Sequence, residues 1–307
     1  MLNKIKAGIA NLALKFISVE EKLSYMFLET FPKNVRPIVI LPAVNTVMRY
    51  IVHKLNKKSI HGLVCNGKLN NIEVSVIQTN MGSPGTAMIM EVLKNCHCKA
   101  AIRIDFCGGL KTTLVGSRPV ETGLNIGSLV IPKTVFLTDG TSLQYLQVNA
   151  KQIIGNPLLH NHARDIAETW KYPTLEGKYW AADSPESLYT IFKNNIGAQN
   201  RRERPDILWS SDSLFCESPE AINTWRLHRC NSVDMESPAI YLLGALYKIP
   251  AISLLGVSNM VDVDALNLMK VNKIHPGIFE SLDAIYHLLA TCLPTIQQEL
   301  VANSNES

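Results

Sequence analysis

The chain has 307 residues, of which 47% are hydrophobic and 18% are charged, and its formal net charge is +4. This length fits one large domain or two smaller ones, and the composition excludes disordered and fibrous proteins. Lysine and arginine are scattered, apart from Arg201, Arg202 and Arg204, which lie beside Glu203 in a segment typical of a solvated loop. We therefore expect no nucleic-acid-binding groove.

Cysteine usage and the length of the apolar runs bear on the compartment. The seven cysteines are an odd number in apolar surroundings, which is typical of reduced thiols in a cytoplasmic protein. Cys96 and Cys98 flank His97, but no second ligand pair follows at zinc spacing, so no metal site is expected. No apolar run reaches the length of a membrane helix, which predicts no stable membrane insertion.

Residues 1–35 are predicted to form a helical extension. A transit peptide or a membrane-surface helix could show similar spacing, but the segment has no arginine, and Glu20 and Glu21 follow its apolar-spaced residues. We therefore expect packing on the body or on a partner subunit, with organellar targeting as the alternative. The apolar residues near helical spacing are Leu2, Ile5, Ile9, Leu12 and Phe16.

The body, residues 36–300, is predicted to be a single α/β domain, because neither a repeat nor a low-complexity linker divides it. A hairpin turn is expected at Asn70-Asn71, a turn at 139–145, and a frayed tail at 301–307. Strands are expected at 36–41, 62–67, 72–78, 100–110, 127–132, 177–182 and 207–210. Helices are expected at 87–93, 157–170, 218–228 and 278–300, and a loop leading into a helix is expected at 184–192.

The stretch 231–262 carries the strongest functional pattern. It opens with VDMES (233–237), runs into an apolar helical segment, turns at Pro250, and ends as an apolar strand with VSN (257–259). Ligands of open α/β folds bind at the carboxyl edge of the sheet, so the carboxylates and the amide are expected at such an edge. An acidic helix N-cap would use the same VDMES residues, and this alternative stays open.

This pattern, VDMES followed about twenty residues later by a strand ending in VSN, resembles the nucleoside phosphorylase family. That family includes purine nucleoside phosphorylases, uridine phosphorylases and methylthioadenosine nucleosidases. The resemblance runs from about residue 36 to about residue 290 and implies a three-layer α/β/α fold with a mixed central sheet. It also implies that Met235 packs on the ribose, that Glu236 accepts hydrogen bonds from its 2′ and 3′ hydroxyls, and that Asp234 lies beside them.

Two segments resemble phosphate-binding parts of the family. Residues 79–86 resemble its T-G-M-G-x-P-S turn, which predicts that Gly82 and Ser83 bind phosphate where a helix begins. Residues 103–109 resemble R-x-G-T-x-G-G, in which the arginine binds phosphate. The resemblance thus implies a phosphate-binding role for Arg103.

The same strand departs from the family pattern in ways that bear on Arg103. Asp105 and Phe106 replace the family's glycine and threonine. A buried arginine needs an anionic partner, so Asp105 could pair with Arg103 and make it structural. The resemblance further implies that Cys107 and Gly108 approach the base.

The loop after the first strand departs further. The family has a Gly-Asp-Pro loop here, with an arginine two residues later, that wraps phosphate. In this chain 42–47 reads PAVNTV, and Arg49 falls two residues late, as a candidate phosphate ligand. By contrast, 127–132 and 139–145 resemble the family's G-D-L-V-I-P and D-G-T-S-x-x-Y.

The base-binding residues also differ. Purine-cleaving members and nucleosidases have Ser-Asp, whose aspartate protonates purine N7, where this chain has Ser258-Asn259. An amide can hydrogen-bond a leaving base but cannot deliver a proton. Asp262, three residues later, could replace this acid only if the loop after the strand turns back toward the base. Tyr189 is a candidate for stacking on the base, or else a core residue.

These features predict a pentosyltransferase that cleaves the N-glycosidic bond of a purine or pyrimidine nucleoside, with inorganic phosphate as co-substrate and no cofactor. Asn259 and Arg103 are the predicted catalytic residues. A hydrolytic nucleosidase and a non-catalytic nucleoside-binding or scaffold protein are the alternatives, because the phosphate loop is altered. The resemblance also implies a homo-oligomer, a dimer, trimer or hexamer. In the family a histidine from a neighbouring subunit often completes the active site, but no histidine precedes His53 in this chain to serve as that residue.

Overall fold

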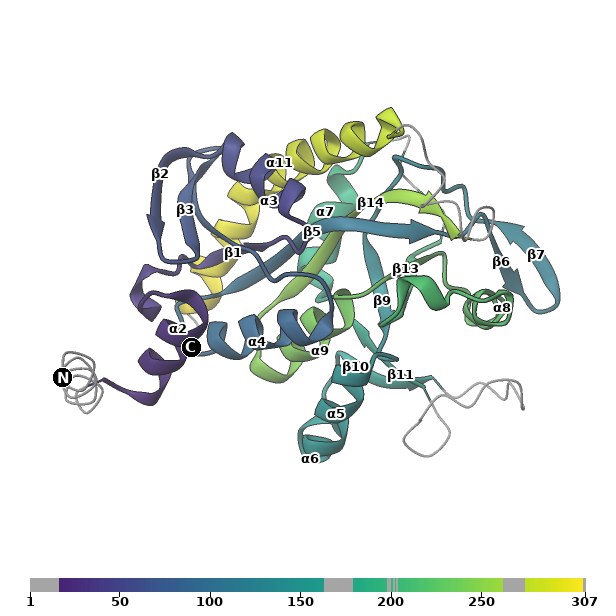
Figure 1. The fold of residues 1–307 in the computed structure, drawn as a ribbon, viewed down its shortest axis with the longest axis horizontal. Helices are drawn as coiled ribbons and strands as arrows, with labels where there is room; N and C mark the ends of the chain where they lie inside the picture. The colour runs from purple at the N-terminus through teal and green to yellow at the C-terminus, as the bar shows by residue number, and fades with distance from the viewer. Residues whose placement is uncertain are drawn as a thin grey trace, which may run out of the picture.

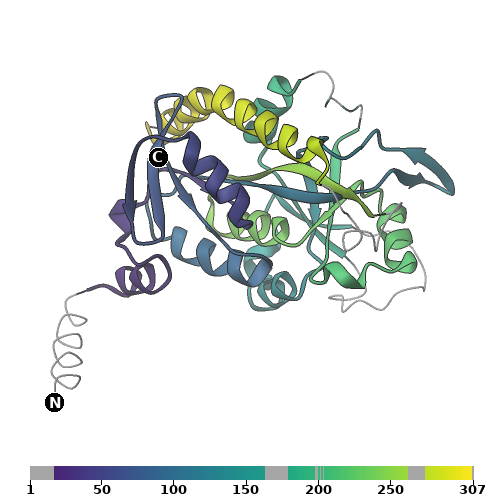
Figure 2. The ribbon, with the colours of Figure 1, turned by 45° about the horizontal axis from the view of Figure 1, so that its top comes forward.

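The computed structural model describes residues 17–162, 179–197, 200, 202, 204–261 and 274–305. In these residues a large mixed sheet lies between two layers of helices, which confirms the predicted three-layer α/β/α architecture (Figure 1, Figure 2). No helix among them is both long and apolar enough to cross a membrane.

The centre of the sheet is β5 (Ala100–Gly109). It pairs in parallel with β1 (Ile38–Leu41) and with β14 (Ala251–Met260), and its last residues meet β13 (Ser232–Asp234) in antiparallel register. Because β1, β5 and β14 are parallel, their carboxyl ends share one edge of the sheet. The expected ligand-binding edge of this fold is therefore formed by segments far apart in the sequence.

The remaining strands extend the sheet on both sides of this centre. The predicted hairpin is confirmed, since Asn70 and Asn71 have φ values of 46° and 65° between its two strands. Beyond β1 lie β4 (Ile72–Ile77), β3 (Val64–Leu69) and β2 (Asn56–His61). Beyond β13 lie β12 (Asp206–Ser210), β9 (Pro132–Phe136), β11 (Tyr179–Asp183) and β10 (Leu159–His162). β8 (Leu129–Val130) pairs with β14, and β6 (Thr112–Val115) forms a separate hairpin with β7 (Arg118–Glu121).

Alternate side chains of the central strands enter two different apolar layers. In β1, Ile38 and Ile40 join the layer beneath α3 (Asn45–Lys54), α7 (Glu186–Asn195) and α11 (Pro276–Asn305). Val39 and Leu41 join the opposite layer, beneath α4 (Ser83–Leu93) and α9 (Ser237–Tyr247). Burial on both faces explains why these strands are continuous apolar runs. The other helices described are α2 (Val19–Leu28), which packs on α4, and α5 (Gly140–Val148), α6 (Ala150–Ile153) and α8 (Pro219–Leu227).

Three sequence-based expectations are wrong. The helix expected at 157–170 begins as strand β10, because Leu159–His162 pairs antiparallel with the edge of β11; residues 163–170 lie outside the described residues. The turn expected at 139–145 is the start of α5, whose N-cap Asp139 accepts a hydrogen bond from the Ser142 N–H at 2.9 Å. The tail expected to fray from residue 301 continues α11 to Asn305.

Candidate functional site

A cavity of about 230 Å³ lies at the carboxyl edge of β5 and β14. Ligand pockets for drug-sized molecules span roughly 300–1,000 Å³, so this one suits a small ligand. Its walls combine four carboxyl side chains with apolar residues. They are Val44, Met81, Arg103, Asp105, Phe106, Cys107, Gly108, Ser211, Leu214, Glu217, Val233, Asp234, Met235, Glu236, Ser258, Asn259 and Val261.

A bulge in β14 aims Asn259 at this cavity. The register with β5 shifts between Val257 and Asn259, leaving Ser258 as the additional residue. The Ser258 hydroxyl lies 2.9 Å from Asn259 Oδ1 and 3.2 Å from the Cys107 carbonyl oxygen, and it can donate to either. Donation to Oδ1 leaves the Asn259 amide N–H groups as donors for a ligand.

Gly108 permits this close arrangement of strands. A Cβ atom there would lie 2.7 Å from Cγ1 of Val261 and 3.0 Å from Cγ1 of Val233, closer than such atoms normally approach. The same Cβ would be 3.8 Å from Nδ2 of Asn259. A side chain at position 108 would thus displace the walls beside the amide.

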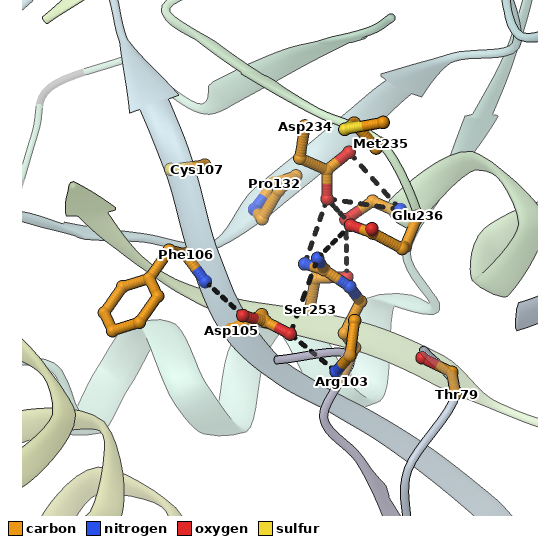
Figure 3. Close-up of polar contacts among 12 residues, drawn as sticks. Thr79, Arg103, Asp105, Phe106, Cys107, Pro132, Asp234, Met235, Glu236 and Ser253 are labelled. Atoms are coloured by element: carbon orange, nitrogen blue, oxygen red, sulfur yellow. Dashed lines mark hydrogen bonds and ion pairs between the residues drawn. The ribbon is translucent and has the colours of Figure 1, made fainter. Parts of the chain in front are cut away.

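Arg103 is buried among three carboxylates at the base of the cavity, with only 2% of it exposed (Figure 3). Its Nη2 donates to Glu236 Oε2, and its Nη1 lies 2.9 Å from Asp234 Oδ2, an ion pair without a well-aligned hydrogen bond. Asp105 Oδ2 is further away, 4.0 Å from Nη2. The expected Asp105 pairing is therefore the longest of the three ion pairs.

The local charges shift two pKa values in this cluster. Burial acts to lower the pKa of Arg103, but Asp234, Glu236 and Asp105 outweigh it and raise the pKa, so the guanidinium stays charged. Burial raises the pKa of Asp234 above its ordinary value; Arg103 opposes this rise, and Glu236 adds to it. The cluster thus holds one fixed positive charge among three acidic groups.

The Asp105 carboxylate accepts the backbone hydrogen bonds of the loop after β1. Its Oδ2 accepts hydrogen bonds from the backbone N–H groups of Ala43 at 2.6 Å and Val44 at 3.1 Å, and its Oδ1 accepts one from Phe106 N–H at 2.9 Å. The side chain is fully enclosed, at 1% exposure. An internal carboxylate therefore occupies the N–H groups of the loop that the family resemblance associates with phosphate.

The turn before α4 donates hydrogen bonds to the VDMES segment, so these donors are not free for a ligand. The Gly82 N–H donates to Glu236 Oε1 at 2.7 Å, and the Ser83 hydroxyl donates to the Met235 carbonyl oxygen at 2.8 Å. The two residues expected to bind phosphate thus already have internal acceptors.

The N-cap of α9 is Glu236, whose side chain makes no capping hydrogen bond, so the acidic N-cap considered as the alternative for VDMES is not formed. The residue that holds the start of this helix is Asp234. Its carboxylate accepts hydrogen bonds from the N–H and the hydroxyl of Ser237, the first residue of α9, with the hydroxyl at 2.6 Å. Ser237 in turn contacts the Ser253 hydroxyl of β14 at 2.8 Å. Asp234 therefore fixes the start of α9 against the central strands, and Met235 and Glu236 follow it at the cavity wall.

Two predicted site residues lie elsewhere, so their placement needs correction. Arg49 lies on the exposed side of α3, because Val47 and Ile51 turn the opposite side to the core, and it lines a different hollow. Tyr189 is only 8% exposed in the apolar layer beneath α7, with Lys133 Nζ 4.8 Å from its ring centroid. Tyr189 is therefore a core residue. Asp262, the other candidate acid, lies outside the described residues.

Sequence reasoning missed the wall formed by Ser211, Leu214 and Glu217. These residues follow β12, whose strand was predicted, so the rule that ligands bind beyond carboxyl ends of strands could have found them. Burial raises the pKa of the Glu217 carboxyl from 4.5 to about 7. Burial also raises the pKa of the Cys107 thiol, which therefore stays protonated.

Known proteins share this fold and part of this sequence. Uridine phosphorylase of Thermococcus kodakarensis is 32% identical over 82 residues, a stretch that spans only 27% of this chain and 26% of that protein. The crystal structure of purine nucleoside phosphorylase from Toxoplasma gondii in complex with immucillin-H superposes with a TM-score of 0.63 at 13% identity, covering 89% of this chain and 96% of that one.

Two further structures agree on the fold. Uridine phosphorylase from Vibrio fischeri ES114 has a TM-score of 0.60 at 16% identity, covering 87% of this chain and 95% of its own. The 5′-methylthioadenosine/S-adenosylhomocysteine nucleosidase from Streptococcus pneumoniae has a TM-score of 0.57 at 15% identity, covering 83% and 97%. The family model described as the phosphorylase superfamily matches residues 37–275. The chain therefore belongs to the phosphorylase superfamily.

Proposed function

We propose that this protein is a nucleosidase that cleaves the N-glycosidic bond of a ribonucleoside with water instead of phosphate. The observation that carries the proposal is the Asp105 carboxylate on the Ala43 and Val44 N–H groups. The sequence alone favours phosphorolysis, and this contact reverses the preference.

Electrostatics support the exclusion of phosphate. Among the residues that the structure describes, the site contains Asp105, Asp234 and Glu236 around one cation, Arg103. A phosphate charge about 4 Å from one uncompensated carboxylate is repelled by roughly 4 kcal/mol at an effective dielectric constant of about 20. Water carries no charge and avoids this repulsion.

The same carboxylates suit the sugar in the transition state. Breaking the N-glycosidic bond leaves a ribosyl group with oxocarbenium character, and nearby negative charge stabilises developing positive charge. Glu236 takes one donor on each oxygen, from Gly82 and Arg103, yet each carboxylate oxygen has two acceptor positions. One position per oxygen remains for the ribose 2′ and 3′ hydroxyls, with Met235 as the apolar contact beside them.

The base would lie against Asn259. With Oδ1 engaged by Ser258, the amide offers N–H donors, which match a carbonyl oxygen or an unprotonated ring nitrogen of the base. This chemistry favours a base with an acceptor edge, such as a 6-oxopurine or a pyrimidine.

A nucleoside-binding protein without catalysis is the second candidate. It is favoured by the presence of the amide Asn259 where the resembled nucleosidases have an acid.

Base release from adenosine, inosine and uridine, measured with and without inorganic phosphate, separates these functions. We expect release at equal rates in both conditions. Release only with phosphate would contradict the proposal, and binding without release would support the second candidate.

A further inference from the structure

Glu217 stands apart from the other carboxyl groups of the cavity. Asp105, Asp234 and Glu236 each accept hydrogen bonds from backbone or hydroxyl groups or pair with Arg103. Within the described residues, no donor or cation contacts the Glu217 carboxyl. Among the described residues, the Glu217 carboxyl group therefore has no hydrogen-bond donor or cation that would stabilise its charged form.

Glu217 lines the cavity in which the base would lie. It directly follows the short 3₁₀ helix Leu214–Cys216 beyond the carboxyl end of β12, and it lines the same cavity as Asn259. The wall of this cavity also includes the apolar residues Leu214, Val233 and Val261. A carboxyl group in such surroundings favours its neutral, protonated form.

The other titratable and charged groups facing this cavity are on β5 and at the junction of β13 and α9. They are Arg103, Asp105, Cys107, Asp234 and Glu236. None of them causes the shift at Glu217, since burial alone raises its pKa to about 7. An acid with this pKa can both hold and release a proton near neutral pH, as general acid catalysis requires.

We propose that the Glu217 carboxyl group is the acid that protonates the base as it leaves. The inference rests on the proposed nucleosidase function and assigns to Glu217 the proton that Asn259 cannot supply. Asn259 then acts as a hydrogen-bond donor that orients the base, and Glu217 is the catalytic acid.

The step balances with water as the only co-reactant. The bond between C1′ and the base nitrogen breaks, its electron pair stays with the base, and the Glu217 proton moves to the base. The oxygen of a water molecule forms the new bond to C1′ and releases one proton to solvent. Solvent then returns a proton to the Glu217 carboxylate, so the net change is one water consumed per base and ribose formed.

Two substrates with the same sugar and different leaving groups test this role. A nucleoside needs a proton on its leaving base, whereas p-nitrophenyl β-D-ribofuranoside releases a stable phenolate that needs none. We expect Glu217→Gln to lower kcat on the nucleoside by about 10²-fold or more and to leave cleavage of the nitrophenyl riboside within a few-fold of the wild type. We expect kcat of the wild type to fall above about pH 7, as Glu217 loses its proton, and we expect Glu217→Gln to lack this fall.

Glu220→Gln is the matched control, because Glu220 is exposed in the first turn of α8, three residues away. It should leave both activities and the pH profile unchanged. An equal loss of both activities in Glu217→Gln, or no loss of either, would overturn the role of Glu217 while the wild-type activity upholds the nucleosidase. A wild-type protein that releases no base would overturn the proposed function itself, and the inference with it.

Discussion

Oε1 of Glu236 accepts a hydrogen bond from the backbone N–H of Gly82 at 2.7 Å, joining two segments that lie 154 residues apart in the sequence. Glu236 also pairs with Arg103 and is only 5% exposed. The residue that the sequence assigns to the sugar hydroxyls is therefore also part of the buried framework of the site.

This double role changes what Glu236→Ala should do. If Glu236 only bound the sugar hydroxyls, as the sequence implies, this variant would lose activity and keep its fold. Removing one partner of a buried ion pair costs about 3–5 kcal/mol, so we now expect a loss of unfolding free energy of this order. Chemical denaturation measures it, with the exposed Glu220→Gln as control. A variant as stable as the wild type would show that Arg103 is sufficiently compensated by Asp234 and Asp105.

Glu236→Gln separates the two roles. The amide oxygen can still accept from Gly82, so we expect a smaller loss of stability than in the alanine variant. The lost charge should weaken ribonucleoside binding more than binding of the matching 2′-deoxynucleoside. Binding of inosine and 2′-deoxyinosine, compared by calorimetry, tests this, and an equal loss for both would argue against contact with the 2′ hydroxyl.

Asp105 can be tested by restoring the family pattern. The double change Asp105→Gly with Phe106→Thr removes the internal carboxylate and frees the Ala43 and Val44 N–H groups. We expect the double variant to be less stable than the wild type and to regain stability as inorganic phosphate is added, as linkage requires for a ligand of the folded state. Thermal unfolding against phosphate concentration is the measurement.

Asp105→Asn is the control for this experiment. Its amide keeps an oxygen acceptor for the loop, so its stability should not respond to phosphate. A phosphate response in the wild type equal to that of the double variant would contradict the idea that Asp105 blocks an anion site.

Asn259→Asp tests how the base is held. The carboxylate keeps an acceptor for Ser258 but loses the N–H donors, so binding of an oxo-base should weaken by roughly 1–3 kcal/mol. The kcat/KM for inosine and for uridine, each divided by kcat/KM for adenosine, should be lower in the variant than in the wild type. A gain on adenosine instead would mean that Asn259 lies where the acid is needed and that Glu217 is not the proton donor.

The pKa of Glu217 also predicts a pH dependence of stability. Because the folded-state pKa is raised above the ordinary 4.5, Glu217 lowers the free energy of unfolding of the wild type as pH rises from about 4.5 to about 7, and this contribution then levels off. Glu217→Gln should lack this loss and be more stable than the wild type above pH 7, by an amount on the order of 3 kcal/mol at most. Urea denaturation measures the free energy of unfolding of both proteins at pH 5 and at pH 8. If the variant and the wild type differ by the same amount at both pH values, the raised pKa is contradicted.

Much of this molecule could be predicted because its signals are local. Apolar runs bounded by turn residues mark β1, β5 and β14, and the residues at their carboxyl ends must share an edge once the strands are parallel. Motif order therefore sufficed to bring Arg103, Glu236 and Asn259 near one cavity. β10 was missed because its strand form depends on pairing with β11, which no local pattern reveals.

The charge balance of the site could not be predicted in the same way. Asp105 is two residues from Arg103 and was the natural partner in the sequence, yet the closer partners, Asp234 and Glu236, come from a segment about 130 residues away. Arg49 was misplaced because the start of α3 at Asn45 decides which side of the helix it occupies. Glu217 belongs to no motif; its place beyond the predicted strand β12 could have been inferred, but the burial of its carboxyl group depends on the folded cavity.

The products formed from a ribonucleoside in the presence of excess inorganic phosphate test the central claim most directly. The Asp105 contact with the loop after β1 predicts free ribose, with no ribose 1-phosphate, and an unchanged yield when phosphate is omitted. Ribose 1-phosphate formed in step with base release would contradict the claim, because it would place phosphate where the Asp105 carboxylate lies.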